Sequence, residues 1–153
     1  MRPIELKIKG INSYREEQVI NFNQLTSQGF FGIFGPTGSG KSTILDAITL
    51  ALYAKLPRGS KNFININETS ASVSFRFSIT TTETKEYLVE RSFRYPGKDR
   101  SSTARNTTAR LSLLSDVDTE ILADKPTDVT RSCTDLLGLS SDDFLRTVVL
   151  PQG

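Results

Sequence analysis

The sequence predicts an α/β fold, a mixed β-sheet with one buried helix and a strand-rich insertion. Three observations carry this prediction. Residues 30–34 form a continuous apolar run, which is typical of a strand buried on both faces. A glycine-rich loop follows at 35–40, and residues 43–53 are apolar almost all round, as in a buried helix. After this helix, alternation of apolar and polar residues predicts several more strands.

The N-terminal strand is predicted at 4–8, where Ile4, Leu6 and Ile8 alternate with charged residues. The clearest alternation in the chain covers 73–79, and the polar residues 81–84 predict a hairpin turn after it. We expect further strands at 19–22, 86–95, 109–114 and 120–122, with a loop over 96–108.

Two helices are predicted near the C-terminal end. The first spans 126–137, with Thr127 as candidate N-cap and Gly138 as its stop signal. The second spans 141–146, has Ser140 or Ser141 as its cap, and carries acidic residues in its first turn.

Composition excludes several classes of protein and of catalytic site. The chain has 153 residues, 37% hydrophobic and 24% charged, which is typical of one globular domain. It lacks an apolar run of the ~20 residues that a membrane span needs and a signal-peptide pattern, so we expect a cytoplasmic protein. The absence of histidine excludes Ser-His-Asp triads and histidine metal sites, and a single cysteine, Cys133, excludes an internal disulfide.

The strongest motif is a phosphate-binding loop, which matches G-x-x-x-x-G-K-[ST] in full. Its glycines let successive backbone N–H groups turn towards one anion, and the helix that follows adds its N-terminal N–H groups. Lys41 supplies a cation for the β- and γ-phosphates, Ser42 a hydroxyl ligand for Mg²⁺, and Thr43 a hydroxyl for the α-phosphate. The predicted ligand is therefore a nucleotide with Mg²⁺, bound by Gly35, Pro36, Thr37, Gly38, Ser39, Gly40, Lys41, Ser42 and Thr43.

A glutamine, Gln152, follows the apolar run 148–150. Its amide oxygen is an uncharged hard ligand that can complete a Mg²⁺ shell and orient a water molecule. Without the phosphate-binding loop, an ordinary surface glutamine would be the better interpretation.

Charge is unevenly distributed. Residues 91–110 hold one carboxylate and six cations: Arg91, Arg94, Lys98, Arg100, Arg105 and Arg110. Residues 111–153 hold eight acids and three bases. The basic segment is a candidate surface for sequence-independent DNA contacts, for which we single out Arg94, Lys98, Arg100 and Arg105. The alternative is a solvated hairpin whose charges only aid solubility.

Four stretches resemble a known family: 11–14, 35–43, 44–53 and 137–153. They are similar to the N-terminal segment of the SbcC family, the ATPase subunits of SbcCD nuclease complexes in the SMC-like branch of ABC-type ATPases. The resemblance implies the N-lobe of an ABC-type P-loop NTPase head. The long separation between Lys41 and Gln152 favours this branch over transporter-type domains.

The resemblance also implies residue roles. Gln152 takes the place of the Q-loop residue that binds Mg²⁺ and senses the γ-phosphate, so Lys41 and Gln152 become the catalytic candidates. Asn12 and Ser13 lie where family members approach the nucleotide, although many relatives carry a cation at the Asn12 position. Residues 66–69 are expected to border the adenosine.

Several parts of a complete head are absent from the sequence. It has no apolar strand ending in Asp-Glu, no signature motif and no switch histidine. We therefore expect 1–153 to be an N-lobe that ends at the Q-loop, without the C-terminal lobe, coiled coil and zinc hook. It is expected to bind ATP but not to hydrolyse it alone. The implied partners are that C-terminal lobe, a second head, an SbcD-type nuclease and DNA, with no membrane.

The implied function is ATP-driven head dimerisation that controls a partner nuclease in double-strand-break repair. Three alternatives stay open. The chain could belong to another SMC-like or transporter-like branch, or it could be a small-molecule kinase. It could also be a non-catalytic, nucleotide-gated interaction module.

Overall fold

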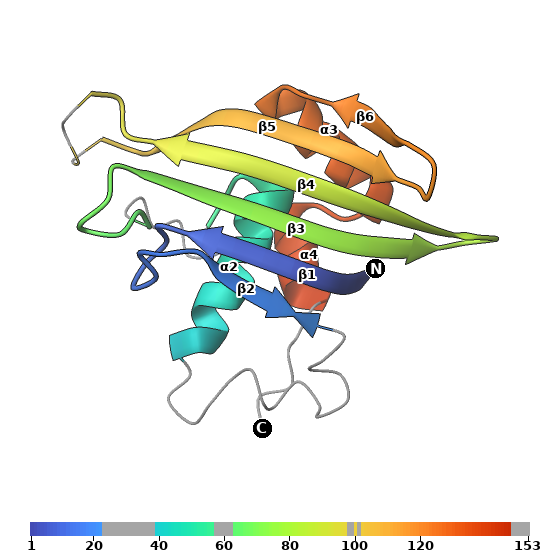
Figure 1. The fold of residues 1–153 in the computed structure, drawn as a ribbon, viewed down its shortest axis with the longest axis horizontal. Coiled ribbons are helices and arrows are strands. Elements are labelled where there is room, and N and C mark those ends of the chain that lie inside the picture. Colours follow the sequence, from blue (N-terminus) through green and yellow to red (C-terminus); the bar gives the residue numbers. More distant parts are fainter. Residues whose placement is uncertain (23–38, 57–62, 98–99, 101, 148–153) are drawn as a thin grey trace.

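The structure, a computed structural model, describes residues 1–22, 39–56, 63–97, 100 and 102–147, without the side chains of 39–42 and 145–147. Its described strands form one sheet in the order β2-β1-β3-β4-β5-β6 (Figure 1). Their bounds are β1 Arg2–Lys9, β2 Gln18–Asn21, β3 Ser70–Thr80, β4 Thr84–Arg94, β5 Arg105–Leu114 and β6 Thr119–Ala123.

All pairings among these strands are antiparallel. The apolar run at 30–34 lies outside the described residues, so the parallel pairing that a mixed sheet needs stays a prediction.

The centre of the sheet is the β3–β4 hairpin, paired without interruption from Ser70–Arg94 to Thr80–Thr84. Its alternation places Val73, Phe75 and Phe77 on the buried face. The rings of Phe75 and Phe77 stack at a centroid distance of 5.3 Å. The predicted hairpin is confirmed, with β4 shifted by one or two residues.

The helices among the described residues lie on the same face of the sheet: α2 Ser39–Tyr53, α3 Pro126–Leu137 and α4 Ser141–Thr147 (Figure 1). The predicted burial of the helix after the glycine-rich loop is confirmed, because Thr49, Ala51 and Leu52 are fully buried. Among the described helices, none is both long and apolar enough to span a membrane.

Some of the cap residues predicted for the helix ends are confirmed and one is wrong. Gly138 ends α3 in the left-handed conformation, and its N–H donates to Thr134 O at 2.8 Å, as expected of a stop signal. The Thr127 cap is wrong, because Lys125 occupies the N-cap position. The ring of Pro126 presets the backbone for the first helical position and starts the helix there. Ser140 caps α4, where its Oγ accepts from the Asp143 N–H at 3.2 Å.

One loop boundary differs from expectation. The predicted loop over 96–108 is too long, because β5 already begins at Arg105 and pairs with the end of β4. Residues 105–108 carry two threonines, whose β-branched side chains suit a strand once a partner strand is present.

Candidate functional site

The site predicted from sequence surrounds the N-terminal end of α2. This helix begins at Ser39, inside the glycine-rich motif, and its first residues are Ser39, Gly40, Lys41 and Ser42. The first N–H groups of a helix have no partner within it and form the positive end of its dipole. The first turn carries no carboxylate to compete for them. Its local structure therefore suits an anion. Residues 35–38, Gln152 and the side chains of Lys41 and Ser42 lie outside what the structure describes.

The turn after β1 reaches this end of α2. Asn12 Nδ2 donates a long hydrogen bond of 3.5 Å to Thr43 Oγ1. The two residues are 31 positions apart in the sequence, so the fold brings together two of the predicted site residues. Thr43 is only 5% exposed, whereas Asn12 and its neighbour Ser13 are exposed. The turn thus lies over the start of the helix and keeps an accessible side.

Asn12 has a left-handed backbone, with φ of 51°. Asparagine tolerates this conformation better than most residues. The Asn12 N–H donates to Phe63 O at 2.7 Å, and Asn12 O accepts from Asn65 Nδ2 at 2.7 Å. The turn is therefore fixed by the chain around residue 65 and not by β1 alone.

Asn65 is a structural residue that sequence reasoning missed. It is buried, and its N–H also donates to Gly10 O at 2.8 Å. Its Oδ1 accepts from the Asn67 N–H at 2.9 Å. Ile66 beside it is 81% exposed, so the segment that is expected to border the adenosine presents an apolar side chain to solvent.

Arg100, a predicted DNA contact, holds the same segment. Its guanidinium donates to the carbonyl oxygens of Glu68, Ile64 and Asn65 at 2.5, 3.1 and 3.0 Å. It also lies over the Tyr95 ring, 5.0 Å from the centroid. These contacts give Arg100 a structural role, and its contact with DNA stays a prediction.

The other cations of the basic segment differ in exposure, and Arg110 is one of the exposed ones. Arg94 and Arg105 are exposed and lie directly opposite each other on β4 and β5. Like charges in such a pair repel, so an anion bound between them would relieve the repulsion. Lys98 lies outside the described residues. Arg91 is 1% exposed, so its inclusion among the surface cations is wrong.

The last turn of α2 also contacts α4 and the residues just before it. Tyr53 donates from its hydroxyl to Leu139 O at 2.9 Å, and its ring packs on Phe144 with a centroid distance of 5.7 Å. Burial raises the pKa of Tyr53 to about 12. The tyrosine is therefore a neutral donor at physiological pH.

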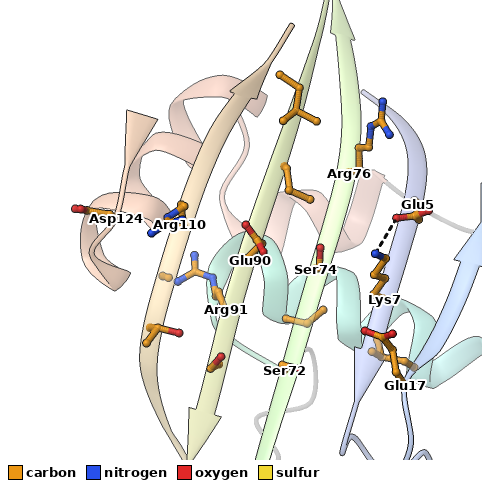
Figure 2. Close-up of a pocket in the computed structure, with 17 residues that line it drawn as sticks. Glu5, Lys7, Glu17, Ser72, Ser74, Arg76, Glu90, Arg91, Arg110 and Asp124 are labelled. Atoms are coloured by element: carbon orange, nitrogen blue, oxygen red, sulfur yellow. Dashed lines mark ion pairs between the residues drawn. The ribbon is translucent and has the colours of Figure 1, made fainter. Parts of the chain in front are cut away.

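One hollow lies elsewhere on the described part of the molecule. It has a volume of about 710 Å³ and covers the face of the sheet away from the helices (Figure 2). Charges of both signs line it, including Glu5, Lys7, Glu90 and Arg110, and Lys7 Nζ lies 3.8 Å from Glu5 Oε1. None of the nucleotide-binding candidates lines it, and neither do the four cations singled out for DNA, although Arg91 and Arg110 of the basic segment do.

This arrangement, a sheet covered on one face by the helix that follows a glycine-rich loop, is consistent with the N-lobe of an AAA- or ABC-type ATPase. The family model of the AAA domain matches residues 5–150, so the chain belongs to that family.

Relatives are similar over the whole chain. The chain is 51% identical over 153 residues to the SbcC protein of the SbcCD nuclease of Clostridium acetobutylicum, and 49% identical over 156 residues to that of Bacillus subtilis. It is 34% identical over 158 residues to a probable DNA double-strand break repair Rad50 ATPase of Aquifex aeolicus. Each match covers 100% of the chain but only 13–14% of the relative. The resemblance deduced from the motifs is confirmed, and the chain corresponds to a small part of these relatives.

Proposed function

We propose that this chain is the ATP- and Mg²⁺-binding lobe of an ATPase subunit that acts in DNA double-strand-break repair. The observation that carries the proposal is the contact between Asn12 and Thr43. It brings the turn after β1 to the start of the helix that follows a complete phosphate-binding motif. The names of the relatives, an SbcCD nuclease component and a Rad50 ATPase, supply the DNA-repair context.

The residues at this end of α2 suit a triphosphate. The N–H groups of the loop and first turn donate to phosphate oxygens, and Lys41 adds a mobile cation. Asn12 offers an amide where many relatives offer a cation, so it contributes a hydrogen bond without charge. The exposed Ile66, held in place through Asn65, is available to pack against the base.

Mg²⁺ fits the donor set that the sequence supplies. Ser42 and Gln152 would hold the ion through a hydroxyl and an amide oxygen, both hard and uncharged, while the phosphates provide the negative charge. The ion would neutralise charge that develops during phosphoryl transfer. In this scheme, Gln152 orients the attacking water and Lys41 holds the γ-phosphate.

Turnover requires groups that the sequence lacks. Walker B carboxylates and a signature motif would come from a C-terminal lobe and from a second head. ATP would then drive head dimerisation, which controls an SbcD-type nuclease. The 153-residue chain alone is expected to bind ATP and to turn over at background rate. A steady-state ATPase rate equal to that of a complete head would contradict this proposal.

The direct test of nucleotide binding is a calorimetric titration of Mg²⁺-ATP into the chain and into Lys41→Ala. Hydrogen bonds to charged groups contribute about 1.5–3 kcal/mol, so the loss of Lys41 should weaken binding about 10- to 100-fold. Lys7→Ala, which removes an exposed lysine from the opposite face of the sheet, is the matched control and should bind normally. Equal affinity of Lys41→Ala and wild type would refute the site.

DNA binding is a second part of the proposal and rests on Arg94, Lys98, Arg100 and Arg105. Replacing Arg94 and Arg105 together by Glu should weaken binding to duplex DNA and flatten its dependence on salt, because fewer counterions are released. Arg76→Glu, on the exposed side of β3, is the control. Unchanged affinity and salt slope in the double variant would remove this surface from the proposal.

A non-catalytic, nucleotide-gated module is the remaining alternative. It predicts the same ATP binding, but it predicts no hydrolysis after the C-terminal lobe of a close relative is supplied. Hydrolysis that appears on adding this lobe, and that Gln152→Ala abolishes, would favour the enzyme.

A further inference from the structure

Among the described residues, Arg91 is the one charged residue that is fully buried, and it lies on the side of the sheet that the helices cover. It belongs to β4, where Tyr87, Val89 and Phe93 are the other buried residues of the same alternation. Its direct neighbours across the sheet are Val73 on β3 and Ala109 on β5, both buried. A guanidinium in such surroundings needs partners for every N–H group.

The five donors of the guanidinium all have acceptors. Nε donates to Ala51 O at 2.7 Å and Nη2 to Leu52 O at 3.0 Å, both on the last turn of α2. The remaining acceptors are Asn106 Oδ1 on β5 at 2.8 Å and, on α3, Pro126 O at 3.3 Å and Thr130 Oγ1 at 2.9 Å. One side chain thus joins β4 to the helix of the candidate site, to β5 and to α3.

No carboxylate among the described residues forms an ion pair with Arg91. Burial lowers the pKa of the Arg91 guanidinium to about 10. The group therefore remains charged at neutral pH. The Cys133 thiol interacts with it, but burial raises the pKa of Cys133 to about 11, so the thiol is neutral. The charge is balanced instead by the carbonyl oxygens of Ala51 and Leu52, the negative end of the α2 dipole.

The contacts at the two ends of α2 therefore differ in kind. Its C-terminal turn is fixed by Arg91, and its N-terminal turn meets Asn12 through Thr43. A helix of 15 residues is about 22 Å long, so Arg91 does not touch a nucleotide at the other end. Any effect of Arg91 on binding must be transmitted through the placement of the helix.

We propose that Arg91 is a positioning residue for nucleotide binding: it fixes the C-terminal turn of α2 against β4, β5 and α3 and so places Thr43 against Asn12. The proposal rests on the proposed function, because it assumes a nucleotide at the start of α2. The competing account is that Arg91 only satisfies buried carbonyl groups and stabilises the fold.

The test compares Arg91→Lys with wild type by titration of Mg²⁺-ATP and by thermal unfolding with and without Mg²⁺-ATP. Lysine keeps the charge but has one ammonium group, which cannot replace a fork that contacts three other elements. Coupling through packed elements typically changes affinity by about 2- to 30-fold, and we expect about tenfold weaker binding. We also expect a smaller ATP-induced rise in Tm. Arg76→Lys is the matched control on the exposed side of β3 and should bind as wild type.

A purely structural role predicts a different result. Arg91→Lys would lower the Tm equally with and without Mg²⁺-ATP, and its folded fraction would bind with wild-type Kd. That outcome would overturn the proposal. If wild type itself fails to bind, or Lys41→Ala binds equally well, the proposed function has failed instead.

Two further variants keep the test decisive. Thr130→Val retains Arg91 and removes one acceptor on α3, so it covers the case in which Arg91→Lys does not fold. It should weaken binding about two- to threefold, at the low end of such couplings, and an unchanged Kd would count against the proposal. In an Asn12→Ala background, Arg91→Lys should have a smaller effect than alone, because the side-chain contact between Asn12 and Thr43 is already removed. A full tenfold effect there would contradict action through Asn12.

Discussion

The two faces of the sheet are built from alternate residues of the same strands and have opposite characters. On β3, Val73, Phe75 and Phe77 are buried under the helices, while Ser72, Ser74 and Arg76 line the polar hollow on the other face (Figure 2). The covered face carries α2 and, with it, the candidate nucleotide site. The open face has a hollow of about 710 Å³, and no residue of the phosphate-binding motif lines it. The two faces therefore offer different surfaces, an apolar one that packs against the helices and a charged one open to solvent.

The largest expected effect is a difference in the free energy of unfolding between variants at two neighbouring positions that face opposite sides of the sheet. Phe75→Ala removes a fully buried ring that stacks on Phe77 and should lower the free energy of unfolding by about 3–5 kcal/mol. Arg76→Ala, one residue further on and facing the open side, should cost less than about 1 kcal/mol. Chemical denaturation measures both. Similar losses for the two variants would mean that the faces do not differ as described.

A second prediction concerns the end of β1 next to Asn12. Gly10 has φ of +70°, and a Cβ there would lie 2.5 Å from Ser70 O. Gly10→Ala should therefore destabilise by about 2–4 kcal/mol, from backbone strain plus the clash. Gly138→Ala has a similar φ of +67° but open space around the Cβ, and it should cost only about 1–2 kcal/mol. If thermal unfolding gave equal losses, the close approach of β1 to Ser70 would be in doubt.

A third prediction concerns the buried Cys133 on α3 and the dependence of stability on pH. Burial raises the pKa of Cys133 from 9.0 to about 11. The unfolded thiol loses its proton near pH 9, whereas the folded one keeps it to about pH 11. Stability present below pH 9 is therefore lost between pH 9 and 11, by an amount on the order of 3 kcal/mol. Urea unfolding of Cys133→Ala across this range should lack this decline. Parallel curves for the variant and wild type would contradict the burial of the thiol.

The smallest effect belongs to the open face. Arg76 Nη2 lies 2.5 Å from Glu86 Oε2, and both side chains are about two-fifths exposed, at 42% and 39%. A double-mutant cycle with Ala at both positions should give a coupling of about 0.2–1 kcal/mol that weakens in high salt. A coupling above 2 kcal/mol would show that this face is less solvated than its exposure indicates.

Patterns with a fixed period were predictable from the sequence. Alternation located β1, β3 and the hairpin, and the apolar run located the buried helix. Glycine located the C-terminal end of α3, whereas Pro126, and not the predicted Thr127 cap, marks its start. These features depend on local chemistry, so no knowledge of the tertiary structure was required.

Features made by tertiary contacts were not predictable in the same way. Asn65 has a role only because the chain at 63–65 approaches Gly10 and Asn12. The charge of Arg91 predicts an exposed side chain. Its position in the alternation with Tyr87, Val89 and Phe93 predicts the opposite, a side chain on the buried face. The residues of the phosphate-binding loop and Gln152 lie outside the described residues, and their roles stay predictions.

The central claim is that Mg²⁺-ATP binds at the start of α2 and not in the hollow of the open face. Amide chemical shifts of the isotope-labelled chain, followed during a titration with Mg²⁺-ATP, test it most directly. We predict the largest changes at 39–43 and at Asn12, with little change at Ser72, Ser74 and Arg110. Largest changes on the open face, with none at 39–43, would contradict it.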